Sequence, residues 1–118
     1  IRNIRYDPPF FVLNDQLLVL LKYCTRGRSP WGFTFVPDEQ TLMSTKASSS
    51  EVIIGLICGS DGVAAFDYEA YYSIAGNRST ALHISCYRPH GAHYEVWGPD
   101  GRMHRKVAPS AWQRILDR

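Results

Sequence analysis

The stretch ALHISCYRPHGAHYEVWGPDGRMHRKV, residues 81–107, carries the clearest strand pattern in the chain. Apolar and polar residues alternate through 82–87 and again through 94–97, and this period of two is typical of half-buried strands. Gly98-Pro99-Asp100-Gly101 then predicts a tight turn, because proline presets the turn dihedral and Gly101 tolerates a positive φ. With a third strand over 102–107, the stretch is predicted to form a three-stranded antiparallel meander.

The alternation assigns the side chains of the meander to two faces. The apolar face is predicted to point inward and consists of Leu82, Ile84, Cys86, Tyr94, Val96, Met103 and Val107. The outer face is predicted to form three cross-strand rows: His83–Trp97–Arg102, Ser85–Glu95–His104 and Tyr87–His93–Lys106. An arginine beside Trp97 predicts a cation–π pair, and Glu95 is predicted to favour protonated His104. The pattern leaves open whether a helix covers this outer face.

The remaining patterns predict an α+β fold with about five antiparallel strands, including the C-terminal meander at 81–107. Helical spacing of apolar residues predicts helices near 15–24, 67–75 and 111–117, and a helix start is also expected at Pro37. Residues 52–58 are apolar on both faces, which is typical of a central buried strand, and Gly59-Ser60-Asp61-Gly62 predicts a turn to a partner strand.

Length and composition predict one globular domain over residues 1–118, standing alone or excised from a longer chain. The sequence is 45% hydrophobic and 20% charged, which is the composition of a globular protein rather than a disordered one. No apolar run is as long as a membrane span, and no signal-peptide pattern is present. Three widely spaced cysteines in apolar contexts predict reduced thiols and therefore a cytoplasmic protein without a membrane partner.

The net charge of +2 conceals an uneven distribution of charged residues. Residues 29–77 contain six acidic residues and one cation, Lys46, whereas the excess of cations lies in residues 1–28 and 78–118. If the two basic ends meet in space, one side of the molecule becomes favourable for nucleic-acid binding.

Sequence motifs for catalysis are weak. The chain contains no Walker loop, no Gly-x-Ser-x-Gly elbow and no GxGxxG motif, so no catalytic residue and no cofactor is predicted. No metal site is predicted either, because the histidines of the meander fall in different rows and His83 and Cys86 point to opposite faces. The remaining enzymatic alternative is a small metal-dependent nuclease that uses the acidic residues Asp61, Asp67 and Glu69.

The leading prediction is therefore a non-catalytic binding module whose partner is nucleic acid. Exposed aromatic rings on a sheet bind unstacked bases, and neighbouring cations bind phosphates. The predicted binding residues are Arg26, Arg28, Tyr87, Arg88, His93, Trp97, Arg102, His104 and Lys106. The alternative is a protein-interaction module or homo-oligomer, because aromatic and arginine residues also anchor protein interfaces.

Overall fold

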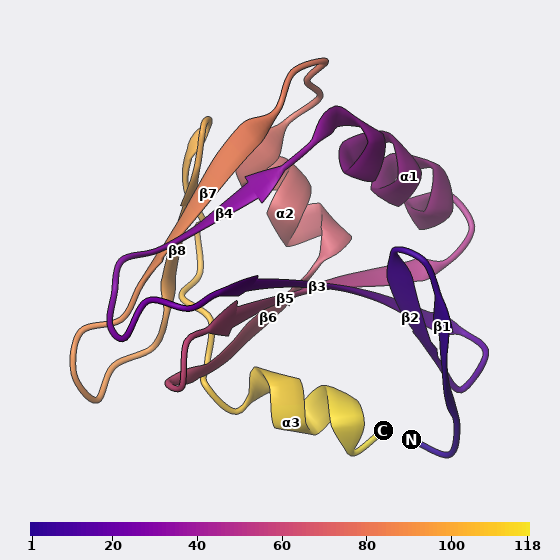
Figure 1. Ribbon diagram of the computed structural model, residues 1–118, viewed down its shortest axis with the longest axis horizontal. Coiled ribbons are helices and arrows are strands. Elements are labelled where there is room, and N and C mark those ends of the chain that lie inside the picture. The colour runs from indigo at the N-terminus through magenta and orange to yellow at the C-terminus, as the bar shows by residue number, and fades with distance from the viewer.

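A computed structural model describes residues 1–118 as two β-sheets and three helices (Figure 1). Sheet A has the strand order β1 (Ile4–Asp7), β2 (Phe10–Leu13), β3 (Leu17–Cys24), β5 (Glu51–Cys58) and β6 (Gly62–Asp67). Sheet B has the order β4 (Trp31–Phe35), β7 (Leu82–Tyr87), β8 (Glu95–Gly98) and β9 (Gly101–Arg102). The helices are α1 (Pro37–Ala47), α2 (Tyr68–Ala75) and α3 (Ala111–Leu116). All strand pairs are antiparallel except β3 with β5, so the predicted α+β class is confirmed.

Sheet A packs against a core cluster on each face, whereas sheet B does so on one. The larger core cluster lies between the two sheets and under α1 and α2, and it includes Phe35, Ile54 and Tyr71. A second, smaller cluster lies on the far side of sheet A, where Ile115 of α3 packs with Val19 and Ile53. None of the three helices is long and apolar enough to cross a membrane.

The helix predicted near residues 15–24 is wrong, because this segment is strand β3. Its apolar run faces a core cluster on each side, since β3 lies between β2 and β5 in the middle of sheet A. A strand that is buried on both faces loses the alternating pattern and resembles a buried helix. Asn14 and Asp15 take the left-handed conformation with φ of 54° and 57° in the β2–β3 turn.

The other predicted helices are confirmed as α2 and α3, and the helix start at Pro37 is confirmed as α1. Asp67 caps α2, where its carboxylate accepts a hydrogen bond from the backbone N–H of Ala70 at 2.8 Å. Residues 52–58 form the predicted central strand within β5, and the turn at 59–62 leads to β6 as expected.

The meander forms, but its third strand is shorter than predicted. Its turn pairs Trp97 with Arg102 and Gly98 with Gly101, and β9 ends at Arg102. Beyond β9, the backbone N–H of Met103 donates to the Val96 carbonyl at 2.7 Å, and Val107 forms an isolated bridge with Tyr94. Met103 and Val107 are buried as predicted. The predicted pairs of Glu95 with His104 and of His93 with Lys106 are not formed, because the third strand is too short to carry them.

The turn at 98–101 packs on the C-terminal end of α2. The backbone N–H of Asp100 donates to the Ile74 carbonyl at 2.9 Å, and the Asp100 carboxylate pairs with Arg78. The α-carbon of Gly98 lies against the same carbonyl, so that a β-carbon there would collide with backbone. Glycine at 98 is therefore required for the meander to dock on the helix.

Replacing Gly98 with alanine is expected to destabilise the fold by about 1–3 kcal/mol, because the carbonyl of Ile74 cannot move away without breaking the end of α2. The free energy of unfolding from urea denaturation measures this effect. Gly27→Ala is the matched control, since a β-carbon at Gly27 meets no atom within 4 Å. Equal losses in the two variants would contradict the close approach.

Candidate nucleic-acid interface

The outer face of sheet B, which points away from the rest of the molecule, carries no helix. The helices pack against sheet A or between the two sheets (Figure 1). Alternation along the strands places eight residues on this outer face: Gly32, Thr34, His83, Ser85, Tyr87, Glu95, Trp97 and Arg102. Their strand neighbours Phe33, Ile84 and Val96 are buried in the core. The outer face is thus open to a ligand.

Two exposed aromatic side chains lie on adjacent strands of this face. Trp97 on β8 is 45% exposed and Tyr87 on β7 is 43% exposed. Because Ser85 pairs with Trp97 and Tyr87 pairs with Glu95, the two rings are diagonal neighbours, with α-carbons about 7–8 Å apart. Aromatic side chains reach across such a distance, so the rings form one shared surface.

A cation lies beside the indole, as the sequence predicts. The guanidinium carbon of Arg102 is 5.8 Å from the centre of the Trp97 ring. The same guanidinium is 3.7 Å from a carboxylate oxygen of Glu95. Arg102 therefore takes the place that the sequence assigned to His104 as the cationic neighbour of Glu95.

The register between β7 and β8 differs by two residues from the predicted one. Ser85 pairs with Trp97 rather than with Glu95, and the loop between the two strands is longer than expected. Pairing with β7 begins only at Glu95, and Tyr94, which is fully buried, forms a bridge with Val107. A shift of two preserves the faces, so the outward side chains are unchanged.

His83 extends the surface toward β4. A β-carbon on Gly32 would lie 2.7 Å from Cε1 and 2.9 Å from Nε2 of the His83 ring, so the imidazole lies directly over this glycine. Sequence analysis placed His83 on the outer face but missed Gly32 and Thr34. Their position depends on the pairing of β4 with β7, which no local pattern reveals.

Beyond Tyr87, two loops place further cations near the outer face. The loop containing Arg26 and Arg28 lies beside the loop after β7, where the hydroxyl of Ser29 donates to the Arg88 carbonyl at 3.3 Å. Arg26, Arg28 and His93 are all exposed. These three predicted residues therefore lie at the end of the face that Tyr87 borders.

Arg88, although predicted as a binding residue, is held by internal contacts. Its guanidinium donates to Asp61 at 2.9 Å and to the Ala92 carbonyl at 2.7 Å, and it lies 5.2 Å from the Tyr94 ring centre. The Tyr94 hydroxyl donates to the same Asp61 carboxylate at 2.7 Å. These contacts join the β5–β6 turn of sheet A to the β7–β8 loop of sheet B. We call the hydrogen-bonded cluster of Asp61, Arg88 and Tyr94 the latch.

The contacts within the latch favour an ionised Asp61 and a protonated Tyr94. Burial opposes ionisation of Asp61, but the hydrogen bonds from Tyr94 and Arg88 and the Arg88 charge outweigh it and hold the pKa of Asp61 below its ordinary value of 3.8. Burial, and then the hydrogen bond to Asp61, raise the pKa of Tyr94. Tyr94 therefore remains a donor and Asp61 an acceptor.

The predicted residues His104 and Lys106 lie elsewhere. They line a groove of about 740 Å³ between the segment after β9 and the start of α2, and Asp67 and Glu69 line the same groove. The cations of this groove therefore share it with two carboxylates, whereas Arg26 and Arg28 form no ion pair with a carboxylate.

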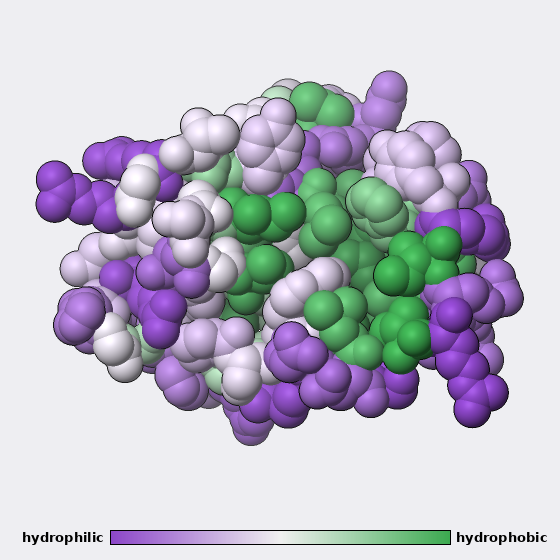
Figure 2. Space-filling view, turned by 60° about the horizontal axis from the view of Figure 1, so that its bottom comes forward, coloured by the Kyte–Doolittle hydropathy of each residue, from purple (hydrophilic) through white to green (hydrophobic).

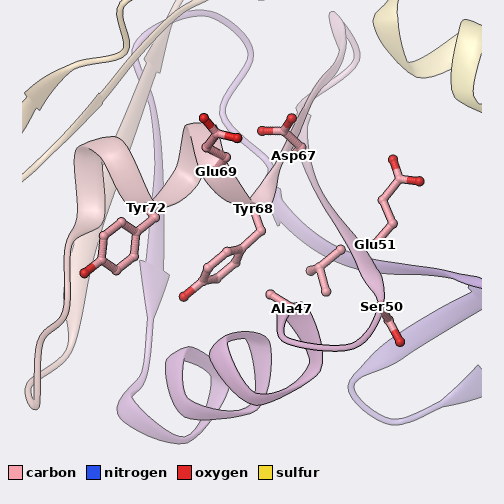
Figure 3. A pocket seen from close by; sticks show the side chains of 8 residues that line it. Ala47, Ser50, Glu51, Asp67, Tyr68, Glu69 and Tyr72 are labelled. Atoms are coloured by element: carbon pink, nitrogen blue, oxygen red, sulfur yellow. The ribbon is translucent and has the colours of Figure 1, made fainter.

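The three acids of the nuclease alternative do not come together. Asp61 and Asp67 lie at opposite ends of β6, roughly 20 Å apart along an extended strand. Figure 3 shows Asp67 and Glu69 with Glu51, which sequence analysis missed, around a pocket of about 390 Å³ that Tyr68 and Tyr72 also line. No three His, Cys, Asp or Glu side chains in residues 1–118 are arranged to hold a metal ion together.

No family model, curated protein or solved structure matches this chain. Its function is accordingly inferred from its own geometry.

The latch predicts a pH-dependent contribution to stability. Because the pKa of Asp61 is lowered on folding, its contribution is complete above about pH 3.8 and is lost as the pH falls through the folded pKa. Asp61→Asn is expected to lower the free energy of unfolding by about 1–2 kcal/mol at neutral pH, and the difference from wild type should shrink in acid.

Urea denaturation at a series of pH values tests this expectation. Asp7→Asn is the control, because Asp7 is exposed and its only ion-pair partner, Arg5, is 3.9 Å away. A difference between wild type and Asp61→Asn that stayed constant down to the most acidic pH would show that the Asp61 charge is not involved.

Proposed function

We propose that this chain binds single-stranded nucleic acid on the outer face of sheet B. The observation that carries the proposal is the pair of exposed rings, Trp97 and Tyr87, on adjacent strands of an uncovered antiparallel sheet. Every base offers a π-face for stacking, so two such rings form a platform for two bases of an unpaired strand.

The geometry favours an unpaired strand over a duplex. A duplex hides its base faces in the stack and is read by elements that enter a groove. The rings of Trp97 and Tyr87 instead lie on a broad sheet face, with Ser85 and Glu95 between them as hydrogen-bonding groups for base edges. Unstacked bases fit such a face, and their polar edges distinguish them from a purely apolar ligand.

Phosphate binding falls chiefly to the loop beyond Tyr87. Arg102 is partly neutralised by Glu95, whereas the exposed Arg26 and Arg28 form no ion pair with a carboxylate. A strand stacked on Trp97 and Tyr87 and continued past the end of β7 would pass beside these two arginines. We place this activity in the cytoplasm, because the three cysteines are free thiols and such thiols persist in a reducing compartment.

Loss of either ring should weaken binding strongly. Trp97→Ala and Tyr87→Ala are each expected to raise the dissociation constant for a short single-stranded oligonucleotide about five- to hundredfold, since stacking on an aromatic ring contributes about 1–3 kcal/mol per base. Fluorescence anisotropy with labelled RNA and DNA oligonucleotides measures this change. Tyr72→Ala is the control, because Tyr72 is similarly exposed, at 49%, but lies on α2.

The proposal is wrong if wild type shows no affinity for either oligonucleotide at low salt in this titration. Wild-type affinity in both ring variants would equally place the site elsewhere.

Salt dependence should identify the phosphate contacts. The double variant Arg26→Gln and Arg28→Gln is expected to lower the slope of log affinity against log salt by about 1.4, because each phosphate contact to a single strand contributes about 0.7. Arg2→Gln with Arg5→Gln is the matched double control at the opposite end of the molecule (Figure 1). An oligonucleotide affinity that does not change with salt would show that these arginines bind no phosphate.

A further inference from the structure

A second open surface lies on sheet A, on the side that carries α3. Pairing of the strands aligns the side chains of this side in four rows. The rows are Ile4–Leu13–Leu17–Glu51, Tyr6–Phe11–Val19–Ile53–Asp67, Leu21–Gly55–Ala65 and Tyr23–Ile57–Val63. Helix α3 has only six residues and packs mainly on β6, the border strand of sheet A, with Ile115 reaching Val19 and Ile53, so the row of Tyr23 and the residues of β1 stay open.

The open parts of this side are apolar. Tyr23 is 74% exposed beside the partly exposed Ile57 and Val63, and Ile4 and Tyr6 are each 60% exposed at the other side of α3. The α3-side surface comprises Ile4, Tyr6, Phe11, Leu21, Tyr23, Ile57, Val63, Trp112 and Leu116. Figure 2 looks onto the molecule from this side and shows hydrophobic residues gathered across its middle, with hydrophilic residues around them.

The exposed apolar area of the α3-side surface is comparable with that of a protein–protein interface. A fully exposed aromatic side chain offers about 150–250 Å², so Tyr6 and Tyr23, at 60% and 74% exposure, contribute roughly 200–340 Å² between them. Ile4, also 60% exposed, and the six partly exposed side chains extend the surface to several hundred Å². That is the upper end of what a monomer exposes in one patch. It is also close to the roughly 800 Å² per partner of a standard protein interface, once a polar rim is added.

The charged residues near this surface indicate which kind of partner it binds. The two charged residues in the four rows, Glu51 and Asp67, lie at the β5–β6 margin, and Glu51 is already paired with Arg118 at 3.0 Å. The charged residues of β1, Arg5 and Asp7, alternate to the opposite face. Arg114 of α3 and Asp117 at its end carry opposite charges, so this side has no excess of cations for a nucleic acid or an anionic membrane. In a two-fold symmetric dimer the same surface of each copy faces the other, so a surface with a net charge would meet like charge. A neutral surface avoids this repulsion.

We propose that the α3-side surface is the interface of a two-fold symmetric homodimer of this chain. Tyr23, Ile57 and Val63 of one copy pack with the same surface of the other. Sheet B lies on the opposite side of sheet A from this interface, so the dimer leaves both outer faces of sheet B open. The inference does not depend on the function of sheet B.

Sedimentation equilibrium of the intact chain over a wide range of concentrations tests the dimer. Wild type is expected to show a concentration-dependent monomer–dimer equilibrium, and Tyr23→Asp should raise its dissociation constant at least about tenfold, as for a central interface aromatic. Because Tyr23 is largely exposed, this change leaves the monomer core intact, and an unchanged circular dichroism spectrum confirms that. Tyr6→Asp, on the other side of α3, should weaken the dimer as well.

The control is Tyr72→Asp, which places the same charge on an exposed tyrosine outside the surface. Dimerisation as strong in Tyr23→Asp and Tyr6→Asp as in wild type overturns the proposal. A wild-type chain that stays monomeric at every concentration overturns it too. So does a monomer that binds vesicles of neutral phospholipid through Tyr23, which would assign the surface to lipid.

Discussion

The parallel pairing of β3 with β5 is the constraint on which the rest of the structure depends. Eight consecutive residue pairs, from Leu17 with Glu51 to Cys24 with Cys58, hold the two strands together in the centre of sheet A. Parallel neighbours cannot be joined by a tight turn, so the chain between them must cross the sheet. That crossing contains β4 and α1: β4 becomes the edge on which sheet B is built, and α1 covers the inner side of sheet A. The open face of sheet B is thus a consequence of a pairing formed in the other sheet.

Where local pattern decides structure, the sequence predicts it well. Alternation through 82–87 and 94–97 assigns the correct side chains to the core and to the surface, and the turn at 98–101 pairs Trp97 with Arg102 as expected. The prediction fails where tertiary contacts override local pattern. The sequence of residues 15–24 resembles a helix because both faces of β3 are apolar. Both faces are apolar because a second core cluster lies beneath α3, on the far side of sheet A from the larger core. Likewise, the register of β7 with β8 departs from the predicted one beside Tyr94, which bridges to Val107 and donates to Asp61 in a distant turn, and no local pattern reveals these contacts.

The candidate site likewise combines residues that local pattern predicts with residues that only tertiary contacts bring together. Tyr87, Trp97 and Arg102 share a face because their spacing along neighbouring strands requires it. Arg26, Arg28 and His93 join them only because two loops meet, which Ser29 and Arg88 bring about. Residue type alone does not reveal that Arg88 is held by Asp61, or that His104 and Lys106 face the carboxylates of Asp67 and Glu69. A list of basic residues therefore overstates the cations that a ligand can reach.

Strand β1 bears on how copies of this chain could associate. It is the outermost strand of sheet A and is only four residues long, and Arg5 and Asp7 alternate along it with Ile4 and Tyr6. Short, charged border strands resist the addition of further strands, since each added neighbour would have to accommodate those ions. Joining through the broad side of the sheet closes after two copies, whereas head-to-tail joining of β1 to the opposite border strand of the next copy would continue without limit. The charged border thus favours a finite assembly over a fibre.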